Sequence, residues 1–137
     1  MGRIINPESA GKDRTRLAKA TVLAIRELMR QGTPDQQTRD LAAFIVLALQ
    51  EIAGSIEPTV AAWEKRGYWI KADRFRMDWE WTTNLGSKLR QATLSEDWPV
   101  VAQLAVQVAM KFGNVKVSPN HRLGAPWVGA WQRLRER

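Results

Sequence analysis

The chain has 137 residues, 45% of them hydrophobic, which suits one domain with a single core and excludes a chain that is disordered by composition. It contains no cysteine, and this excludes disulfides, thiolate catalysis and cysteine-ligated zinc sites. The net charge is +7, and the 14 arginines among the 21 basic residues favour an anionic partner such as nucleic acid, although a GC-rich genome would also enrich arginine.

The N-terminus and the apolar segments predict a protein that is neither secreted nor embedded in a membrane. The N-terminus lacks the apolar stretch of a signal peptide. The longest apolar run, residues 41–49, is too short to cross a bilayer. We therefore expect a cytoplasmic protein without a membrane partner.

The first predicted helix follows a short arm. Residues 1–12 contain Pro7 and two glycines and are expected to form a flexible N-terminal arm. Asp13 is a suitable N-cap for a helix over residues 14–31, which Gly32 ends. Spacings of three and four residues predict one buried stripe along this helix. The stripe comprises Leu17, Ala18, Thr21, Val22, Ala24, Ile25, Leu28 and Met29.

The second predicted helix begins at the sequence Thr33-Pro34-Asp35. Thr33 is the expected N-cap, and Pro34 takes the first helical position. The helix runs to about residue 53. Residues 41–52 are apolar on nearly every side, which is typical of a helix that is surrounded by other helices.

A third helix is expected over about residues 57–92, and it is longer than the others. The apolar period passes through Gly67 without a phase shift, and no new N-cap follows before Asp73. These features favour one continuous helix, bent at most at Gly67. The alternative is a helix that ends there, because two cations, Lys65 and Arg66, precede the glycine.

The last predicted helix and the tail complete the chain. Ser95 is the expected N-cap of a fourth helix, which has Pro99 in its first turn, reaches about Phe112 and is nearly as buried as the second. Prolines and glycines interrupt the chain beyond it, and a short terminal helix over residues 130–136 is compatible with the sequence.

The predicted fold is all-α, an antiparallel four-helix bundle with one long helix and an irregular C-terminal tail. We expect the bundle domain to span residues 13–113. The basic, Trp-containing tail over residues 114–137 is expected to pack on the bundle or on a partner.

A row of basic residues on the first helix is the main candidate binding site. Five cations fall within a narrow arc at 100° per residue. They are Lys12, Arg16, Lys19, Arg26 and Arg30. A one-sided basic row is typical of phosphate-backbone binding, and Arg133 and Arg135 of the tail are expected to add to it. The alternative is an ordinary solvated face opposite the core.

The aromatic-rich segment over residues 68–81 divides into two apolar strips on a helical wheel. One strip faces the bundle. The second strip contains Tyr68, Phe75 and Trp79 and needs a cover, because exposed aromatic residues favour aggregation. The tail residues Trp127 and Trp131, a second copy of the chain or a ligand could supply it, and a homodimer is the expected oligomer.

One arginine is predicted to lie on the core face of this helix. Arg74 falls among the apolar residues of the strip that faces the bundle, and Asp78 follows it at a spacing of four. Because a buried cation needs a partner, Arg74 and Asp78 are predicted to form a buried ion pair.

No catalytic, cofactor or metal motif is present in the sequence. His121, the only histidine, lies in the tail without a carboxylate nearby in sequence. We therefore predict a non-enzymatic helical protein that requires no cofactor and no metal. It is expected to bind RNA or DNA through phosphate contacts without sequence specificity. The alternative is an assembly module that self-associates through the second aromatic strip.

Overall fold

The computed structural model describes the backbone of residues 7–137 and the side chains of residues 10–137, and this range is all-α as predicted. The helices are α1 (Pro7–Met29), α2 (Gln36–Gly54), α3 (Ile56–Lys65), α4 (Trp69–Trp79), α5 (Trp81–Leu94), α6 (Trp98–Lys111) and α7 (Ala130–Arg135).

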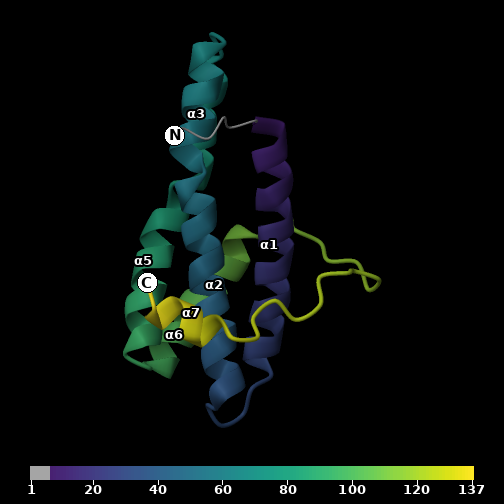
Figure 1. Cartoon of the computed structure of the whole chain (residues 1–137), viewed down its shortest axis with the longest axis vertical. Coiled ribbons are helices and arrows are strands. Elements are labelled where there is room, and N and C mark those ends of the chain that lie inside the picture. Colours follow the sequence, from purple (N-terminus) through teal and green to yellow (C-terminus); the bar gives the residue numbers. More distant parts are fainter. Residues whose placement is uncertain (1–6) are drawn as a thin grey trace.

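The helices α1, α2, α5 and α6 form the predicted antiparallel four-helix bundle (Figure 1). The central helix is α2, which contacts α1, α5 and α7. Its apolar composition places nine apolar residues in the core, and Thr38 is buried beside them. The helix α3 continues the direction of α2 beyond the end of the bundle, and α4 returns beside it (Figure 1).

The start of α2 differs from the prediction by two residues. Asp35, not Thr33, is the N-cap: its carboxylate accepts a hydrogen bond from the Thr38 backbone N–H at 3.0 Å. The Thr38 hydroxyl in turn accepts from the Asp35 N–H at 3.3 Å. This reciprocal pair is a capping box, which satisfies two backbone donors that the first turn leaves without partners.

The prediction of one long helix over residues 57–92 is wrong, because the chain reverses at Gly67. This glycine has φ +81°, a conformation that side chains disfavour. The Gly67 N–H donates to the Glu64 carbonyl at 3.0 Å, and the Tyr68 N–H donates to the Trp63 carbonyl at 2.9 Å. These two bonds form a Schellman motif that ends α3. A second interruption, at Glu80, separates α4 from α5.

The first helix starts earlier than expected. It begins at Pro7, so residues 7–12 are helical and do not belong to a flexible arm. Proline suits the first helical position because the N–H that it lacks has no partner there. The rest of the expected arm, residues 1–6, lies outside the described residues.

The outer face of α6 is more exposed than its apolar sequence predicts. The side chains of Val101, Leu104 and Val108 are buried, but Val106 and Met110 are exposed. The bundle surrounds α2 and leaves α6 at its edge. The apolar composition of α6 therefore does not correspond to complete burial.

One helical segment is long and apolar enough to cross a membrane by length and composition. It is Gln36–Lys65, which joins α2 and α3, and 56% of its most apolar window is buried inside the protein. The core helix of a helical bundle has the same composition.

The tail returns to the bundle and ends in α7. In Figure 1 it loops out beyond α1 and crosses back to α7, which packs on α2. Trp127, Ala130 and Leu134 are buried there. The carboxylate of Asp40 on α2 accepts hydrogen bonds from the Gly129 N–H at 3.2 Å and from the Trp131 N–H at 2.9 Å. Asp40 therefore fixes the start of α7.

Candidate functional site

The five basic residues predicted on the first helix are all exposed: four lie on one face of α1, and Arg30 lies directly after its last residue, Met29. They are Lys12, Arg16, Lys19, Arg26 and Arg30. The opposite face of α1 is buried against α2 through Ala18, Thr21, Ala24, Ile25 and Leu28. The basic face is therefore turned away from the core.

Two of these cations have acidic neighbours on the same helix. Arg16 lies 3.6 Å from Asp13, and Arg30 lies 3.1 Å from Glu27. Neither Lys19 nor Arg26 has a carboxylate within 4.0 Å among the side chains of residues 10–137. Exposed ion pairs are weak and exchange readily with other anions, so the face remains positive.

The tail cations, in contrast, are engaged with the tail itself. Both Arg133 and Arg135 are exposed on α7. The guanidinium of Arg133 donates to the carbonyls of Val128 and Pro126 at 3.2 and 3.3 Å. The guanidinium of Arg135 lies 5.7 Å from the centroid of the Trp131 ring. These contacts order the tail around the start of α7.

Arg14 is a functional candidate that the sequence reasoning missed. It is only 5% exposed, and its Nη1 donates to the hydroxyls of Ser55 at 3.1 Å and Thr59 at 3.2 Å. Burial lowers the pKa of the Arg14 guanidinium. A signal was present in the sequence: Arg14 extends the buried stripe of α1 by one turn, four residues before Ala18.

The second aromatic strip is covered mainly from within the chain. The ring of Phe75 lies 4.9 Å from that of Trp63 in an edge-to-face arrangement and 4.5 Å from the guanidinium carbon of Arg14. Trp79 contacts Phe75 and Phe112, with ring centroids 6.2 and 6.4 Å apart. Both Phe75 and Trp79 are half-buried as a result.

The other predicted interface residues lie elsewhere. Tyr68 is 54% exposed at the turn between α3 and α4. The tail residues Trp127 and Trp131 lie over α2, where Trp127 is buried and Trp131 is partly buried. The structure therefore does not bring the five residues of the predicted interface together on one surface.

The prediction of a buried Arg74–Asp78 ion pair is wrong. Both side chains are exposed, and their charged atoms are more than 4.0 Å apart. Because the chain reverses at Gly67, the α4 face that carries Arg74 is turned to solvent. The arginine that joins α4 to α3 is Arg76, which donates to both carboxylate oxygens of Glu57 at 2.9 and 3.2 Å. These bonds lower the pKa of Glu57.

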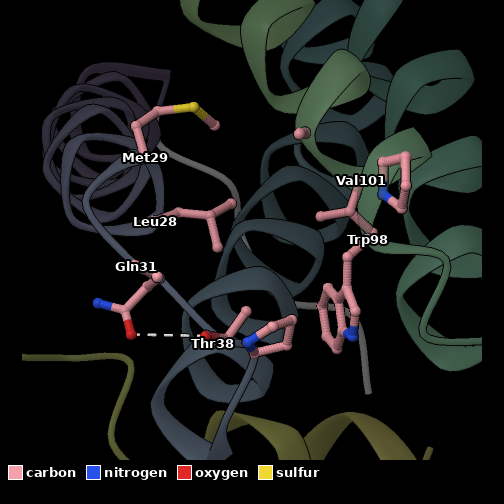
Figure 2. A pocket seen from close by; sticks show the side chains of 10 residues that line it. Leu28, Met29, Gln31, Thr38, Trp98 and Val101 are labelled. Carbon is pink, nitrogen blue, oxygen red and sulfur yellow. Dashed lines mark hydrogen bonds between the residues drawn. The ribbon is translucent and has the colours of Figure 1, made fainter.

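Two clefts lie along the side of α1. The first, about 320 Å³, lies where the C-terminal end of α1 meets the start of α6 (Figure 2). Its walls are mainly apolar, with Leu28 and Met29 on one side and Trp98 and Val101 on the other (Figure 2). The polar groups of Gln31 and Thr38 bond to each other at 3.4 Å, so they are already paired.

The second cleft, about 460 Å³, lies between α1, α4 and the start of the tail. Its lining combines cations, aromatic rings and small residues. The residues are Gly11, Arg14, Thr15, Ala18, Lys19, Phe75, Trp79, Asn114, Val115 and Lys116. Lys19 belongs both to this cleft and to the basic face of α1, so the two features adjoin.

No family model, curated protein or solved structure matches this chain. The function must therefore be argued from the chemistry of these surfaces.

That chemistry supports binding of anions. Within the described part of the chain, no group of three or more His, Asp and Glu side chains is placed to hold a metal ion. The Nδ1 atom of His121 accepts a hydrogen bond from the Leu123 N–H at 3.3 Å within the tail loop. The strongest features are cationic, namely the face of α1 and the buried guanidinium beside it.

Proposed function

We propose that this protein is a non-enzymatic binding protein that holds RNA or DNA through phosphate contacts with the basic face of α1. The observation that carries the proposal is the placement of four exposed cations on one face of α1, with a fifth, Arg30, directly after the helix. They are Lys12, Arg16, Lys19, Arg26 and Arg30. The row from residue 12 to residue 30 is about 27 Å long at 1.5 Å per residue, long enough to meet several phosphates.

The charge distribution supports this choice of surface. Lys19 and Arg26 have no acidic partner within 4.0 Å among the side chains described, and the pairs of Arg16 and Arg30 are exposed. Lys116 of the tail lines the same cleft as Lys19 and adds a cation beside the row. The predicted role of Arg133 and Arg135 becomes secondary, because their guanidinium groups already order the tail.

The proposed binding has little sequence preference. Phosphate contacts position a protein on nucleic acid, whereas base contacts specify the sequence. The outward side chains of this face are long, flexible cations rather than a set of amide and arginine groups arranged for base edges.

Fluorescence anisotropy tests the proposal with a labelled duplex DNA and a labelled single-stranded RNA at low salt. We expect binding at micromolar protein, and two duplexes of unrelated sequence should differ by less than about threefold in affinity. Absence of binding to both nucleic acids at about 50 mM salt and about 10 µM protein would contradict the proposal.

Self-association is the second candidate function, and the exposed apolar residues of the α3–α4 hairpin favour it. Tyr68, Trp69, Ile70 and Met77 are 54%, 61%, 73% and 71% exposed. Such a concentration of large apolar side chains is typical of an interaction surface. The proposed interface thus moves from Phe75 and Trp79, which pack inside the chain, to the outside of the hairpin.

Light scattering on the wild type and on an Ile70→Glu/Met77→Glu double variant tests this second proposal. Because both side chains are exposed, the double variant should fold normally and become monomeric. A wild type that is already monomeric at high concentration would contradict it. Phe75→Glu is not a suitable variant, because it places a charge among Trp63, Trp79 and Arg14.

A further inference from the structure

Arg14 is a buried cation whose described partners are all neutral. Its guanidinium donates to the hydroxyls of Ser55 and Thr59, and no carboxylate among residues 10–137 lies within 4.0 Å of it. Buried charges in proteins are normally paired with an opposite charge, because leaving water is costly. The neighbouring acids are used elsewhere: Asp13 lies beside Arg16, and Glu57 binds Arg76. Among the side chains of residues 10–137, the site therefore provides no anion for Arg14.

The guanidinium of Arg14 borders the 460 Å³ cleft between α1, α4 and the tail. This volume is within the range of small-molecule sites. Gly11, one turn before Arg14, leaves the approach open: a Cβ atom at this position would lie 3.8 Å from Arg14 Nη2. Nη2 is therefore the part of the guanidinium next to the space that a side chain at residue 11 would fill.

The rest of the lining is arranged for an anion joined to a flat apolar group. Lys19 and Lys116 are exposed cations that line the cleft, and no acidic residue is among its described lining. The rings of Phe75 and Trp79 form an aromatic wall, with centroids 6.2 Å apart and planes inclined at 43°. A planar ring can stack or meet such a wall edge to face.

We propose that this cleft binds a small molecule that carries a carboxylate or phosphate on a planar ring. The anionic group is held by Arg14, Lys19 and Lys116, and the ring lies against Phe75 and Trp79. Charge-assisted hydrogen bonds from a guanidinium are strong and suit both kinds of anion. The cleft shares Lys19 with the basic face of α1, but the proposal does not depend on nucleic-acid binding, because Arg14 and the aromatic wall lie off that face.

Nuclear magnetic resonance of the indole N–H groups tests the proposal on the full chain. Phenyl phosphate and benzoate serve as probes that combine an anion with a ring, and inorganic phosphate and phenol represent the separate halves. At least one of the two combined probes should shift the Trp79 signal saturably and bind about tenfold more tightly than either half. The Trp98 signal, which reports on the other cleft, should not move. Whichever combined probe binds more tightly identifies the preferred anion.

Two variants locate the binding. Arg14→Met removes the cation and keeps an apolar chain of similar length, and we expect at least a tenfold loss of affinity. Gly11→Leu keeps Arg14 but fills the approach to Nη2, and it should also abolish binding. Gly54→Leu is the matched control, because Gly54 is exposed and has open space around its Cβ position. It should bind as the wild type does.

Three results would overturn the proposal. The first is an unmoved Trp79 signal at millimolar concentrations of both combined probes. The second is wild-type affinity in folded Arg14→Met or Gly11→Leu protein. The third concerns Glu8, whose side chain lies outside the described range. If Glu8→Gln binds phenyl phosphate more than about tenfold more tightly than the wild type, the Glu8 carboxylate is itself the anion that pairs with Arg14.

Discussion

The guanidinium carbon of Arg14 lies 4.5 Å from the centroid of the Phe75 ring, and this contact joins α1 to the α3–α4 hairpin. The same guanidinium bonds Ser55 and Thr59, at the start of α3. Arg14 thereby fixes the side of α1 that faces inward. The basic face on the opposite side of α1 is held toward solvent.

The packing of Phe75 predicts unequal effects of two substitutions on the same helix. Phe75→Ala should lower the free energy of unfolding by about 2 kcal/mol, because the half-buried ring contacts Arg14 and Trp63. Ile70→Ala should change it by less than about 0.5 kcal/mol, because Ile70 is exposed. Urea unfolding measures both. Equal effects would mean that the ring of Phe75 is not held as described.

The turn at Gly67 predicts opposite effects for two glycine substitutions. Gly67→Ala should destabilise the protein by about 1 kcal/mol, because an alanine is strained at φ +81°. Gly54→Ala should stabilise it by up to about 1 kcal/mol, because Gly54 is helical and has free space beside it. Thermal unfolding followed by circular dichroism distinguishes them. A continuous helix through residue 67 would instead make Gly67→Ala stabilising.

The turn at Gly67 also shows how far the sequence could predict the fold. The bundle, the end of α6 and the short α7 follow from local apolar periods and from prolines and glycines. The predicted start of α6 is wrong, because Asp97 is its N-cap and Ser95 is the C-cap of α5. The hairpin does not follow from the sequence in this way, because α3 and α4 pack against each other and the apolar period looks the same for a straight helix and for one that folds back. Only Lys65 and Arg66 before Gly67 indicate a helix that ends there. The uninterrupted apolar period favours a straight helix and is the stronger of the two signals.

The candidate site was predictable in part. The basic row depends only on helical spacing, so four of its members lie on one face of α1 as predicted, and Arg30 lies directly after the helix. The burial of Arg14 depends on Ser55 and Thr59, more than forty positions away, and no local pattern indicates those partners. The predicted Arg74–Asp78 pair was wrong for the same reason as the long helix, since it assumed the wrong orientation of residues 69–79.

The capping box predicts a pH effect on stability. The Thr38 backbone N–H lowers the pKa of Asp35 in the folded protein. A lowered pKa stabilises the fold above the pKa of the unfolded chain, about 3.9, and this contribution is lost as the pH falls through the folded value. The melting temperature of the wild type should therefore fall more steeply below about pH 4 than that of Asp35→Asn, since asparagine caps without titrating.

Circular dichroism melts over a pH series measure this difference. The carboxylate of Glu57, whose pKa Arg76 also lowers, is present in both proteins, so its effect cancels in the comparison. Parallel curves for the wild type and Asp35→Asn would show that the cap makes no titrating contribution.

Asp40 predicts how the tail is attached. Asp40→Ala removes the acceptor of the Gly129 and Trp131 N–H groups. It should lower the free energy of local opening of α7 by roughly 1–2 kcal/mol and so accelerate amide hydrogen exchange there by about tenfold. Glu51→Ala, at an exposed position of the same helix, is the control. Unchanged exchange in Asp40→Ala would mean that apolar contacts alone hold the tail.

The salt dependence of nucleic-acid binding tests the central claim most directly. Two double variants remove the same charge, Lys19→Ala/Arg26→Ala on α1 and Arg133→Ala/Arg135→Ala on α7. If α1 makes the phosphate contacts, the first variant should reduce the slope of log affinity against log salt by about 2 and weaken binding, whereas the second should keep nearly the full slope. Equal losses in the two variants would show that binding follows net charge alone and would contradict the assignment to α1.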